Sequence, residues 1–485
     1  MAETYQVAGG NNITVSNPTP PQLTASGLTN ADQFYLETVE LITPVNNVSI
    51  KSLVVELSYY EDILKGSVTG HLLLSDSISL IERLQLSGGD FLNLSFSKSQ
   101  GNKDTSSIKK YFRIYRVSER ILINAETENY TLHFCSEELF LSEQSKVSKP
   151  YSGQKISDIV YDILNNHLKI NDKYISLQET DGLYDFVIPY KKPFEAINWL
   201  STYAIQKNKT GADFVFFENS GGFNFISLQN MFNQTEYATY AYSQKNAPEM
   251  NGADELGRGI NGIKSYTFLD TFDSLYGVTS GAFANRLISV DPLTRRYKDT
   301  KFDYLKDYVN KVDTLNKVKN INNSSVINDL KNRFGKTQNQ NYDGVLKVMV
   351  SNADQKVAKG ISDIPFSVAG DVRVETYVPY RTAQIALSHY SRIKLTLSGD
   401  PNLTVGRTIK VVLPSSVSNK DGSGYNEGNP DPINSGKYLI AAVRHIITTE
   451  MRYETVVEVV KDSFASPLTN FTSSEKLTDA INGKR

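Results

Sequence analysis

Apolar and polar residues alternate with a period of two along the last structured stretch of the chain, residues 393–462. The alternation runs through IKLTLSG, NLTVGRTIKVVLP, SGKYLIAAVRHIIT and YETVVEVVKDSF, which are separated by segments rich in Gly, Asn, Asp and Pro. This pattern predicts antiparallel strands with one buried face, joined by turns. Such strands commonly curl into a small barrel.

A second stretch near the N-terminus shows the same order of signals. Gly88–Gly89 leads into DFLNLSFS, and a polar loop, KKYFRIYRVSER and ENYTLHFCSEEL follow. Aligning the two stretches pairs Gly89 with Gly406, Tyr111 with Tyr438, Arg116 with Arg444, and Tyr130 with Tyr453. Chance likeness between short strands is the alternative explanation. We interpret the match as an internal duplication, so that one chain carries two copies of one barrel.

The hydrophobic period changes to that of a helix over residues 151–168. The apolar positions there are Ile156, Ile159, Val160, Ile163 and Leu164. A second helix is expected to begin at Pro193, since proline is favoured at the first helical position. DFVFFE and FNFISL, on either side of a turn at residues 219–222, predict a hairpin. Two helices packed on a hairpin indicate a compact α+β middle module.

The remaining segments set the expected boundaries. Strands are expected in YLETVELIT, SIKSLVVELSYYED, GSVTGHLLLSD, IKSYTFLDTFD, LYGVTSGAFANRLISVD and YDGVLKVMVSN. Helices are expected in SISLIERLQL, capped by Ser77, and in VPYRTAQIALSHYSRI. The expected parts are an N-terminal arm (1–33), a first tube-like β-barrel (34–148), a middle α+β module and linker (149–262), a second tube-like β-barrel (263–465) with a polar helical insertion near 298–340, and a C-terminal tail (466–485). The expected fold class is mainly β with α+β.

Composition narrows the class of protein. The 485 residues suffice for roughly three domains. With 40% hydrophobic and 21% charged residues, the chain fits a soluble globular protein. The formal net charge of −2 gives no basic excess of the kind that favours nucleic acids. No apolar run approaches the ~20 residues that cross a bilayer, and the N-terminus lacks the layout of a signal peptide. We therefore expect no stable nucleic-acid binding, no membrane insertion and no secretory route.

Candidate chemistry is sparse. Gly257, Gly259 and Gly262 match a G-x-G-x-x-G string, but a polar loop precedes it and a strand-like segment follows, whereas a dinucleotide site needs a strand and then a helix. A flexible turn is the better interpretation. The five histidines are His71, His133, His167, His389 and His445, and none has H-x-H or H-E-x-x-H spacing. They predict no metal site and are read as packed or surface residues.

Nucleophilic and ionic candidates are equally weak. Cys135 is the only cysteine, which excludes an intrachain disulfide, and no G-x-S-x-G elbow occurs. A glycosidase-like carboxylate pair has no signature, although the 53 acidic residues leave that possibility open. Four arginines fall on barrel strands or turns and are read as solvated, with a pore or an interface as the alternative: Arg116, Arg120, Arg444 and Arg452. The N-x-S/T triplets at Asn12, Asn47 and Asn402 are read as incidental. We expect no catalytic, cofactor-binding or metal-binding residues.

In its order of parts, the chain resembles the baseplate hub protein of contractile-tailed bacteriophages, a family related to the hub portion of type VI secretion spike proteins. The resemblance is carried by four segments: ELSYYEDILKGSVTGHLLLSDS, YSGQKISDIVYDIL, IPYKKPFEAINWLSTYAI with GADFVFFENSGGFNFISL, and LTLSGDPNLTVGRTIKVVLP with SGKYLIAAVRHII. Residues 298–340 have no obvious counterpart in that family.

The resemblance implies a structural, non-enzymatic virion protein of the tail baseplate, assembled in the host cytoplasm. It implies a homotrimer whose six barrels adapt the sixfold tail tube to a threefold central spike and nucleate tube assembly. The implied partners are a tail tube or tube-initiator protein above, the spike below, baseplate wedge proteins outside and, as an open option, a tape-measure protein in the lumen. Spike and lytic functions would belong to a separate polypeptide. The alternatives are a peptidoglycan hydrolase of the baseplate, a receptor-binding adhesin, or the hub of a bacterial contractile injection or type VI secretion system.

Overall fold

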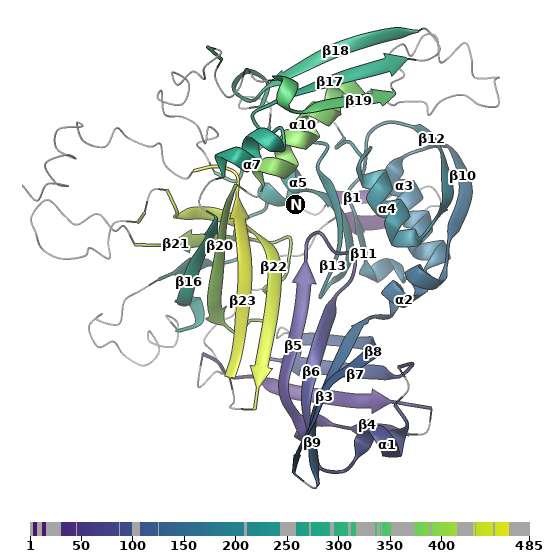
Figure 1. Ribbon diagram of the computed structural model, residues 1–485, viewed down its shortest axis with the longest axis vertical. Helices are drawn as coiled ribbons and strands as arrows, with labels where there is room; N and C mark the ends of the chain where they lie inside the picture. Colours follow the sequence, from purple (N-terminus) through teal and green to yellow (C-terminus); the bar gives the residue numbers. More distant parts are fainter. Residues whose placement is uncertain are drawn as a thin grey trace, which may run out of the picture.

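The fold is described from a computed structural model of the chain (Figure 1). It describes residues 3–6, 12–15 and 31–464, apart from gaps at 45, 87, 99–106, 125, 208–210, 243–258, 271–272, 292–294, 309–311, 317–334, 337–339, 341, 351–373, 389, 415–429, 432 and 450–451. Among the described residues, no helix is both long and apolar enough to cross a bilayer.

One 13-stranded sheet runs through the molecule (Figure 1). Its hydrogen-bonded order is β16 (Ile263–Asp270), β20 (Ser391–Ser398), β23 (Arg452–Lys461), β22 (Gly436–Thr448), β5 (Val54–Asp62), β6 (Thr69–Asp76), β9 (Thr127–Ser136), β8 (Ser107–Asn124), β7 (Phe91–Ser97), β3 (Tyr35–Ile42) and β4 (Asn47–Ser49). Strand β21 (Thr408–Val412) branches from β22 and carries β15 (Thr239–Ala241), the one parallel pairing in this sheet among the described strands. The expected mainly antiparallel β fold is confirmed.

Two units within this sheet have the same strand order. Unit 1 is β5-β6-β9-β8-β7, and unit 2 is β16-β20-β23-β22-β21. Along the chain the strands also come in the same sequence, β5 to β9 in unit 1 and β16 and then β20 to β23 in unit 2. Each unit buries alternate side chains in its own core, such as Leu72 and Leu132 in unit 1, and Leu395 and Val457 in unit 2. The shared order supports the internal duplication, but pairing of β22 with β5 makes the two units parts of one sheet.

A β-bulge at the same place in both units fixes how they align. In unit 1 the bulge lies between Ile114 and Arg116, opposite Phe134 and His133 of β9. In unit 2 it lies between Ile440 and Ala442, opposite Val459 and Glu458 of β23. We use these positions, and the registers of the neighbouring strands, to define equivalent residues in the two units.

This alignment corrects three of the four residue pairs expected from the sequence. Gly89 and Gly406 remain equivalent, but the position of Tyr438 is taken by Phe112, that of Arg444 by Ser118 and that of Tyr453 by Glu128. Phe112 and Tyr438 are both fully buried, whereas Tyr111 is 54% exposed. The expected pairs were wrong because residues of one type recur on neighbouring pleats, and a pattern of letters does not show which one faces the core.

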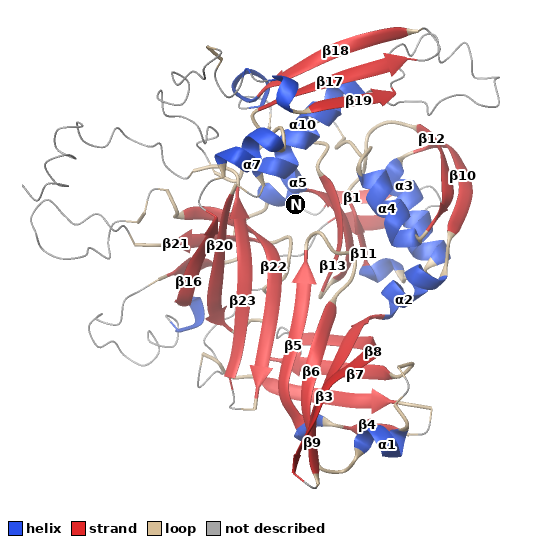
Figure 2. Cartoon of the chain, in the orientation of Figure 1, coloured by secondary structure: helices blue, strands red, loops and turns tan. Residues whose placement is uncertain are grey.

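The middle module packs helices on a hairpin, as expected. Its strands are β10 (Val147–Gln154), β11 (Ile175–Leu177), β12 (Tyr184–Lys191), β13 (Phe214–Asn219) and β14 (Gly222–Ser227), and its helices are α2 (Glu137–Gln144), α3 (Ile156–Asp162) with a π-helical turn (Ile163–His167), and α4 (Pro193–Ser201). The helix expected over 151–168 begins only at Ile156, because residues 151–154 belong to β10. Figure 2 shows that most of the helices lie outside the two units, which are almost entirely strands.

Both faces of the β13–β14 hairpin are buried. Phe214 and Phe216 belong to the core of the middle module, whereas Val215 and Phe217 belong to the core of unit 2. Period-two alternation therefore continues along β13, but apolar residues occupy both sets of positions. The hairpin is a shared wall that holds the middle module against unit 2.

A separate three-stranded sheet is inserted within the part expected to be the second barrel. Here β17 (Ala284–Asp291) pairs with β18 (Arg296–Asp303) and β19 (Leu346–Val350), next to α7 (Ser274–Thr279) and α10 (Val374–Leu387). The helices expected near 298–340 are wrong for residues 298–303, which lie in β18, and a π-helical turn (Tyr304–Tyr308) follows. Residues 317–334 of that expected insertion lie outside the described ones. Polar alternation in β18 concealed this strand. Its partner β17 lies in the stretch 275–291 where a strand was expected, although the start of that stretch belongs to α7.

The short elements complete the chain. They are β1 (Glu3–Gln6), β2 (Asn12–Val15), α1 (Leu80–Leu84), α5 (Leu228–Phe232) and 3₁₀ turns at Lys51–Leu53, Asp172–Tyr174 and Tyr342–Gly344. Strands β1 and β2 pair as a hairpin within the N-terminal arm. Ser79, not Ser77, is the N-cap of α1, and the Asp76 carboxylate accepts the backbone N–H groups of Ile78 (2.8 Å) and Leu80 (2.6 Å). The expected cap was wrong because the acid at the end of β6 satisfies these donors.

Candidate functional site

The junction of the two units is the feature from which a site can be built. Seven residue pairs join β22 to β5, from Ala442 opposite Asp62 to Thr448 opposite Glu56. Across this junction the Arg444 guanidinium lies 3.1 Å from Glu56 Oε1 and donates to Ser58 Oγ at 3.0 Å. The candidate site is therefore a surface of strand pairing, formed by backbone hydrogen bonds between β22 and β5.

A buried acid, Glu61, stabilises the end of this junction where Ala442 lies opposite Asp62. Glu61, at 2% exposure, accepts hydrogen bonds from the Tyr59 hydroxyl (3.1 Å) and from the backbone N–H groups of Ser220 (2.7 Å) and Val405 (3.0 Å). These donors come from β5, the β13–β14 turn and the loop before β21, so one carboxyl joins three parts of the chain. Burial raises the pKa of this carboxyl to about 7, although all three donors favour the ionised form.

A second buried acid attaches the middle hairpin to unit 1. Glu218, fully buried on β13, accepts from the backbone N–H of Val68 (2.8 Å) and from the Ser136 hydroxyl (2.5 Å), and it pairs with Lys110. Burial lowers the pKa of Lys110. The sequence offered no signal for Glu61 or Glu218, because an isolated glutamate on a strand looks like an exposed one.

Among the described strands, the edges of β8 and β16 that correspond to this junction have no partner. Strand β8 is the equivalent of β22, and it pairs with β7 only over residues 107–113, so that the same edge of residues 116–124 has no partner among the described strands. Strand β16 is the equivalent of β5, and among the described strands its 263–270 segment pairs only with β20. The chain therefore has one joined junction and two free halves of an equivalent junction.

Exposure of equivalent side chains shows the same difference. On β22, Val443 and Ile447 are each 2% exposed, whereas their equivalents on β8, Val117 and Leu122, are 37% and 63% exposed. On β5, Tyr59 is fully buried, whereas its equivalent on β16, Phe268, is 40% exposed. Apolar side chains covered at the internal junction are thus open to water at the free edges. Unprotected apolar edges of this kind are typical of strands that pair with another chain.

Three of the histidines and arginines singled out in the sequence, His71, His133 and Arg444, lie on the face of the sheet opposite the cores. His71 and His133 are directly opposite each other on β6 and β9, with ring centroids 6.0 Å apart, and burial lowers the pKa of both. Arg444 stacks over Tyr60 on the same face (5.4 Å to the ring centroid). Arg120 instead forms a two-pronged pair with Glu128. This face carries a band of aromatic and cationic groups across five strands.

The other histidines in the described residues, His167 and His445, lie apart from this face and from each other. His445 is buried in the core, where it bonds the Tyr453 hydroxyl at 2.9 Å, and burial lowers its pKa to about 3. His167 ends the π-helical turn, 3.9 Å from Asp162. His389 lies outside the described residues. Within the described ranges, no three His, Cys, Asp or Glu side chains could hold a metal ion together.

The remaining candidates are structural. Cys135 is buried on β9, and burial raises the pKa of its thiol to about 11, so little reactive thiolate forms. Gly259 and Gly262 lie just before β16, a strand and not the helix that a dinucleotide site needs, and Gly257 lies outside the described residues. Arg452 begins β23. Asn12 begins β2 and Asn47 begins β4, and Asn402 follows Asp400, whose carboxylate accepts its backbone N–H at 2.9 Å.

Comparison with known proteins gives one curated relative and several distant structural likenesses. No family profile matches the chain. The "Probable baseplate hub protein gp334" of Vibrio phage KVP40 is 24% identical over 273 residues, which make up 55% of this chain and 62% of that protein. The chain thus spans less than two thirds of that relative's length. The resemblance to baseplate hub proteins noted in the sequence is confirmed by this relative.

Two of the solved structures that resemble the chain are tail proteins, and each matches most of its length. One is the tail protein from Neisseria meningitidis MC58, with 9% identity and a TM-score of 0.48, covering 88% of this chain and 97% of that one. Another is the 43 kDa tail protein of prophage MuSo2 from Shewanella oneidensis, with 10% identity and a TM-score of 0.45, covering 88% and 98%.

Proposed function

We propose that this chain is a structural, non-enzymatic hub protein of a phage tail baseplate, in which three copies form a ring of six repeated units. The observation that carries the proposal is the joined β22–β5 junction beside the two free, equivalent edges on β8 and β16. The similarity to a baseplate hub protein supports the assignment to a tail.

The ring follows from pairing like edges. If β8 of one copy pairs with β16 of the next as β22 pairs with β5, every copy offers one edge of each kind. Such a head-to-tail contact is heterologous, and it closes into a ring when the rotation at each junction divides a full turn. Three copies with two units each give six units, so the ring has approximate sixfold and strict threefold symmetry.

The register of the β22–β5 junction predicts which residues of β8 and β16 would face each other between two copies. Ile447 lies opposite Leu57 in the internal junction, and their equivalents are Leu122 and Tyr266. Leu122 of one copy would therefore face Tyr266 of the next. The pairing would cover Leu122, Val117 and Phe268 together, which removes the apolar exposure seen at both edges.

The symmetry of such a ring fits the partners expected from the sequence. A sixfold tail tube could stack on the repeated units, which would nucleate tube assembly, while a threefold spike could bind elements present once per chain. Wedge proteins would lie outside the ring, and a tape-measure protein in the lumen would face the aromatic and cationic band of the sheet. The protein would reside in the virion, at the tail baseplate.

Light scattering coupled to size-exclusion chromatography tests the assembly. The expected result is a single species with the mass of three 54.2 kDa chains. A stable monomer at micromolar concentration that also fails to bind its own particle's tube and spike proteins would overturn the proposal.

A further inference from the structure

The inserted three-stranded sheet has two edges that differ in their chemistry. Figure 1 shows this sheet at one end of the molecule, away from units 1 and 2. Within the described strands its order is β18-β17-β19, so β18 forms one edge and β19 forms the other. An edge strand presents backbone N–H and C=O groups with which a further strand can pair.

The β18 edge is protected by charge, as sheet edges commonly are. Lys298, Asp299 and Lys301 are all exposed on this strand. Charged side chains on an edge strand oppose pairing with another chain, because pairing would remove the charges from water. The β18 edge is therefore unsuited to adding a strand.

The β19 edge lacks this protection. Its side chains Leu346, Val348 and Val350 are 50%, 64% and 54% exposed. The one charged residue of β19, Lys347, points to the other face of the sheet, where its Nζ donates to Thr382 Oγ1 of α10 at 2.7 Å. An apolar edge of this kind is typical of a strand that another chain covers.

The backbone of β19 turns the same three residues toward the open side. Arg286 of β17 donates its N–H to the carbonyl of Val345, and the parallel register places Arg286 opposite Leu346. Bonding groups alternate along a strand of a parallel ladder, so the backbone groups of Leu346, Val348 and Val350 face away from β17. The residues with exposed apolar side chains thus also carry the backbone groups available to a fourth strand.

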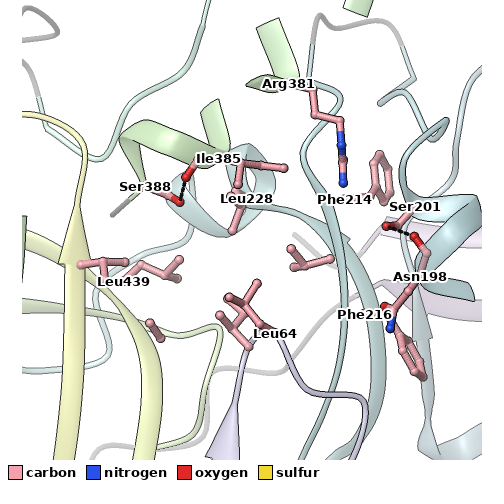
Figure 3. A pocket seen from close by; sticks show the side chains of 14 residues that line it. Leu64, Asn198, Ser201, Phe214, Phe216, Leu228, Arg381, Ile385, Ser388 and Leu439 are labelled. Carbon is pink, nitrogen blue, oxygen red and sulfur yellow. Dashed lines mark hydrogen bonds between the residues drawn. The ribbon is translucent and has the colours of Figure 1, made fainter. Parts of the chain in front are cut away.

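Helix α10 anchors the sheet to the rest of the molecule. On the inner face of the sheet, Phe302 packs against Tyr380 of α10, with ring centroids 5.3 Å apart. Farther along α10, Arg381 and Ile385 line a cavity of about 140 Å³ where units 1 and 2 meet the middle module (Figure 3). The β19 edge is therefore presented by a preformed support, which lowers the entropic cost of binding a partner.

The size of this edge decides between two occupants. A second copy of the chain could pair its own β19 with this one, but a five-residue strand covers far less than the roughly 800 Å² per partner that a stable interface buries. Two copies would not stay together through this edge alone. A segment of another protein that is already held nearby by other contacts needs no such area, because the other contacts raise its effective concentration.

We propose that β19 is a docking edge for an extended segment of a second protein, which adds to the inserted sheet as a fourth strand. The backbone of the segment pairs with Leu346, Val348 and Val350, and its apolar residues, at alternate positions, pack beside the side chains of these three residues. The inference goes beyond the ring of six units and does not depend on it, because every residue of the edge belongs to one chain.

Isothermal titration of the full-length protein with the end-capped peptide KTVTVTVK tests this edge. The peptide is expected to bind at least tenfold more tightly than KTSTSTSK, which keeps the backbone but lacks the apolar side chains. Val348→Lys places a charge on the edge and should weaken binding at least tenfold. Val348→Pro removes the outward N–H and should do the same, since proline is tolerated on edge strands. Tyr297→Lys places a charge on the same face at the β18 edge and should leave binding within twofold.

Several outcomes would overturn the proposal. They are the absence of saturable binding at millimolar peptide, equal affinity for the two peptides, or binding that Val348→Lys leaves unchanged, which would place the peptide on another edge such as β8 or β16. A dimer of chains in light scattering that Val348→Lys abolishes would make a second copy the occupant instead. Thermal melting verifies that each variant folds, and if Val348→Pro does not fold, Val348→Lys decides alone.

Discussion

The substitution Leu122→Ala tests the free edge of β8 without altering the internal junction between β22 and β5. Leu122 is 63% exposed in the single chain, and its equivalent Ile447 is 2% exposed. Covering Leu122 to the same extent would remove on the order of 100 Å² of apolar surface from water, worth about 2.5 kcal/mol. Alanine retains roughly a third of that area, so Leu122→Ala should cost about 1.5 kcal/mol at each interface.

A closed ring of three chains multiplies this loss. With three equivalent interfaces the trimer loses about 4.5 kcal/mol, which corresponds to an association constant lower by roughly a thousandfold. Mass photometry of a dilution series measures the trimer fraction directly. The folding of the single chain should barely change, because Leu122 contacts mostly water before assembly.

Two further variants make the comparison specific. Leu183→Ala removes a leucine of similar exposure, 54%, from the middle module and should leave the trimer intact. Ile447→Ala opens a cavity inside the chain and should lower its unfolding free energy by about 2–4 kcal/mol. The reasoning is refuted if Leu122→Ala and Leu183→Ala assemble equally well.

Three other outcomes follow from the same contacts. The double variant Leu122→Cys, Tyr266→Cys should give disulfide-linked trimers on a non-reducing gel after mild oxidation, whereas either single variant should not. A gel of the double variant that shows only monomers would contradict the proposed register. Glu218→Ala should leave Lys110 without its buried partner and cost about 3–5 kcal/mol, which hydrogen exchange would detect as faster exchange at Val68; unchanged protection there would contradict the assigned role. Burial lowers the pKa of His445 to about 3, below the ordinary value of 6.5, so protonation of the unfolded chain should reduce stability as the pH falls from about 6.5 toward 3. His445→Phe should flatten this acid dependence in chemical denaturation, and an equal dependence in both proteins would show that His445 is not its source.

The sequence predicted what periodicity alone determines. Alternation in 91–136 and 393–462 located β7 to β9 of unit 1 and β20 to β23 of unit 2, and Pro193 located the start of α4, because these features depend on nearby residues only. The pairing of β22 with β5 could not be predicted from the sequence. It joins residues about 380 positions apart through backbone N–H and C=O groups, which carry no sequence signal. The register of the repeat was missed by one or two residues for a related reason: only the bulges at Ile114 and Ile440 fix it.

The candidate site was harder to predict than the fold. Val117, Leu122 and Phe268 look like ordinary alternating strand residues, and only the exposure of these residues beside that of their covered equivalents marks them. Glu61 and Glu218 likewise resemble solvated acids until the chain closes around them. Val117, Leu122 and Phe268 are distinguished by a contact that their equivalents make in the internal junction and that they lack in the single chain.

Cryo-electron microscopy of the purified, assembled protein tests the central claim most directly. The account predicts a threefold ring of six similar β units, in which β8 of each copy continues into β16 of its neighbour as β22 continues into β5. A ring of another number of units, or a trimer that leaves the edges of β8 and β16 open to solvent, would contradict it.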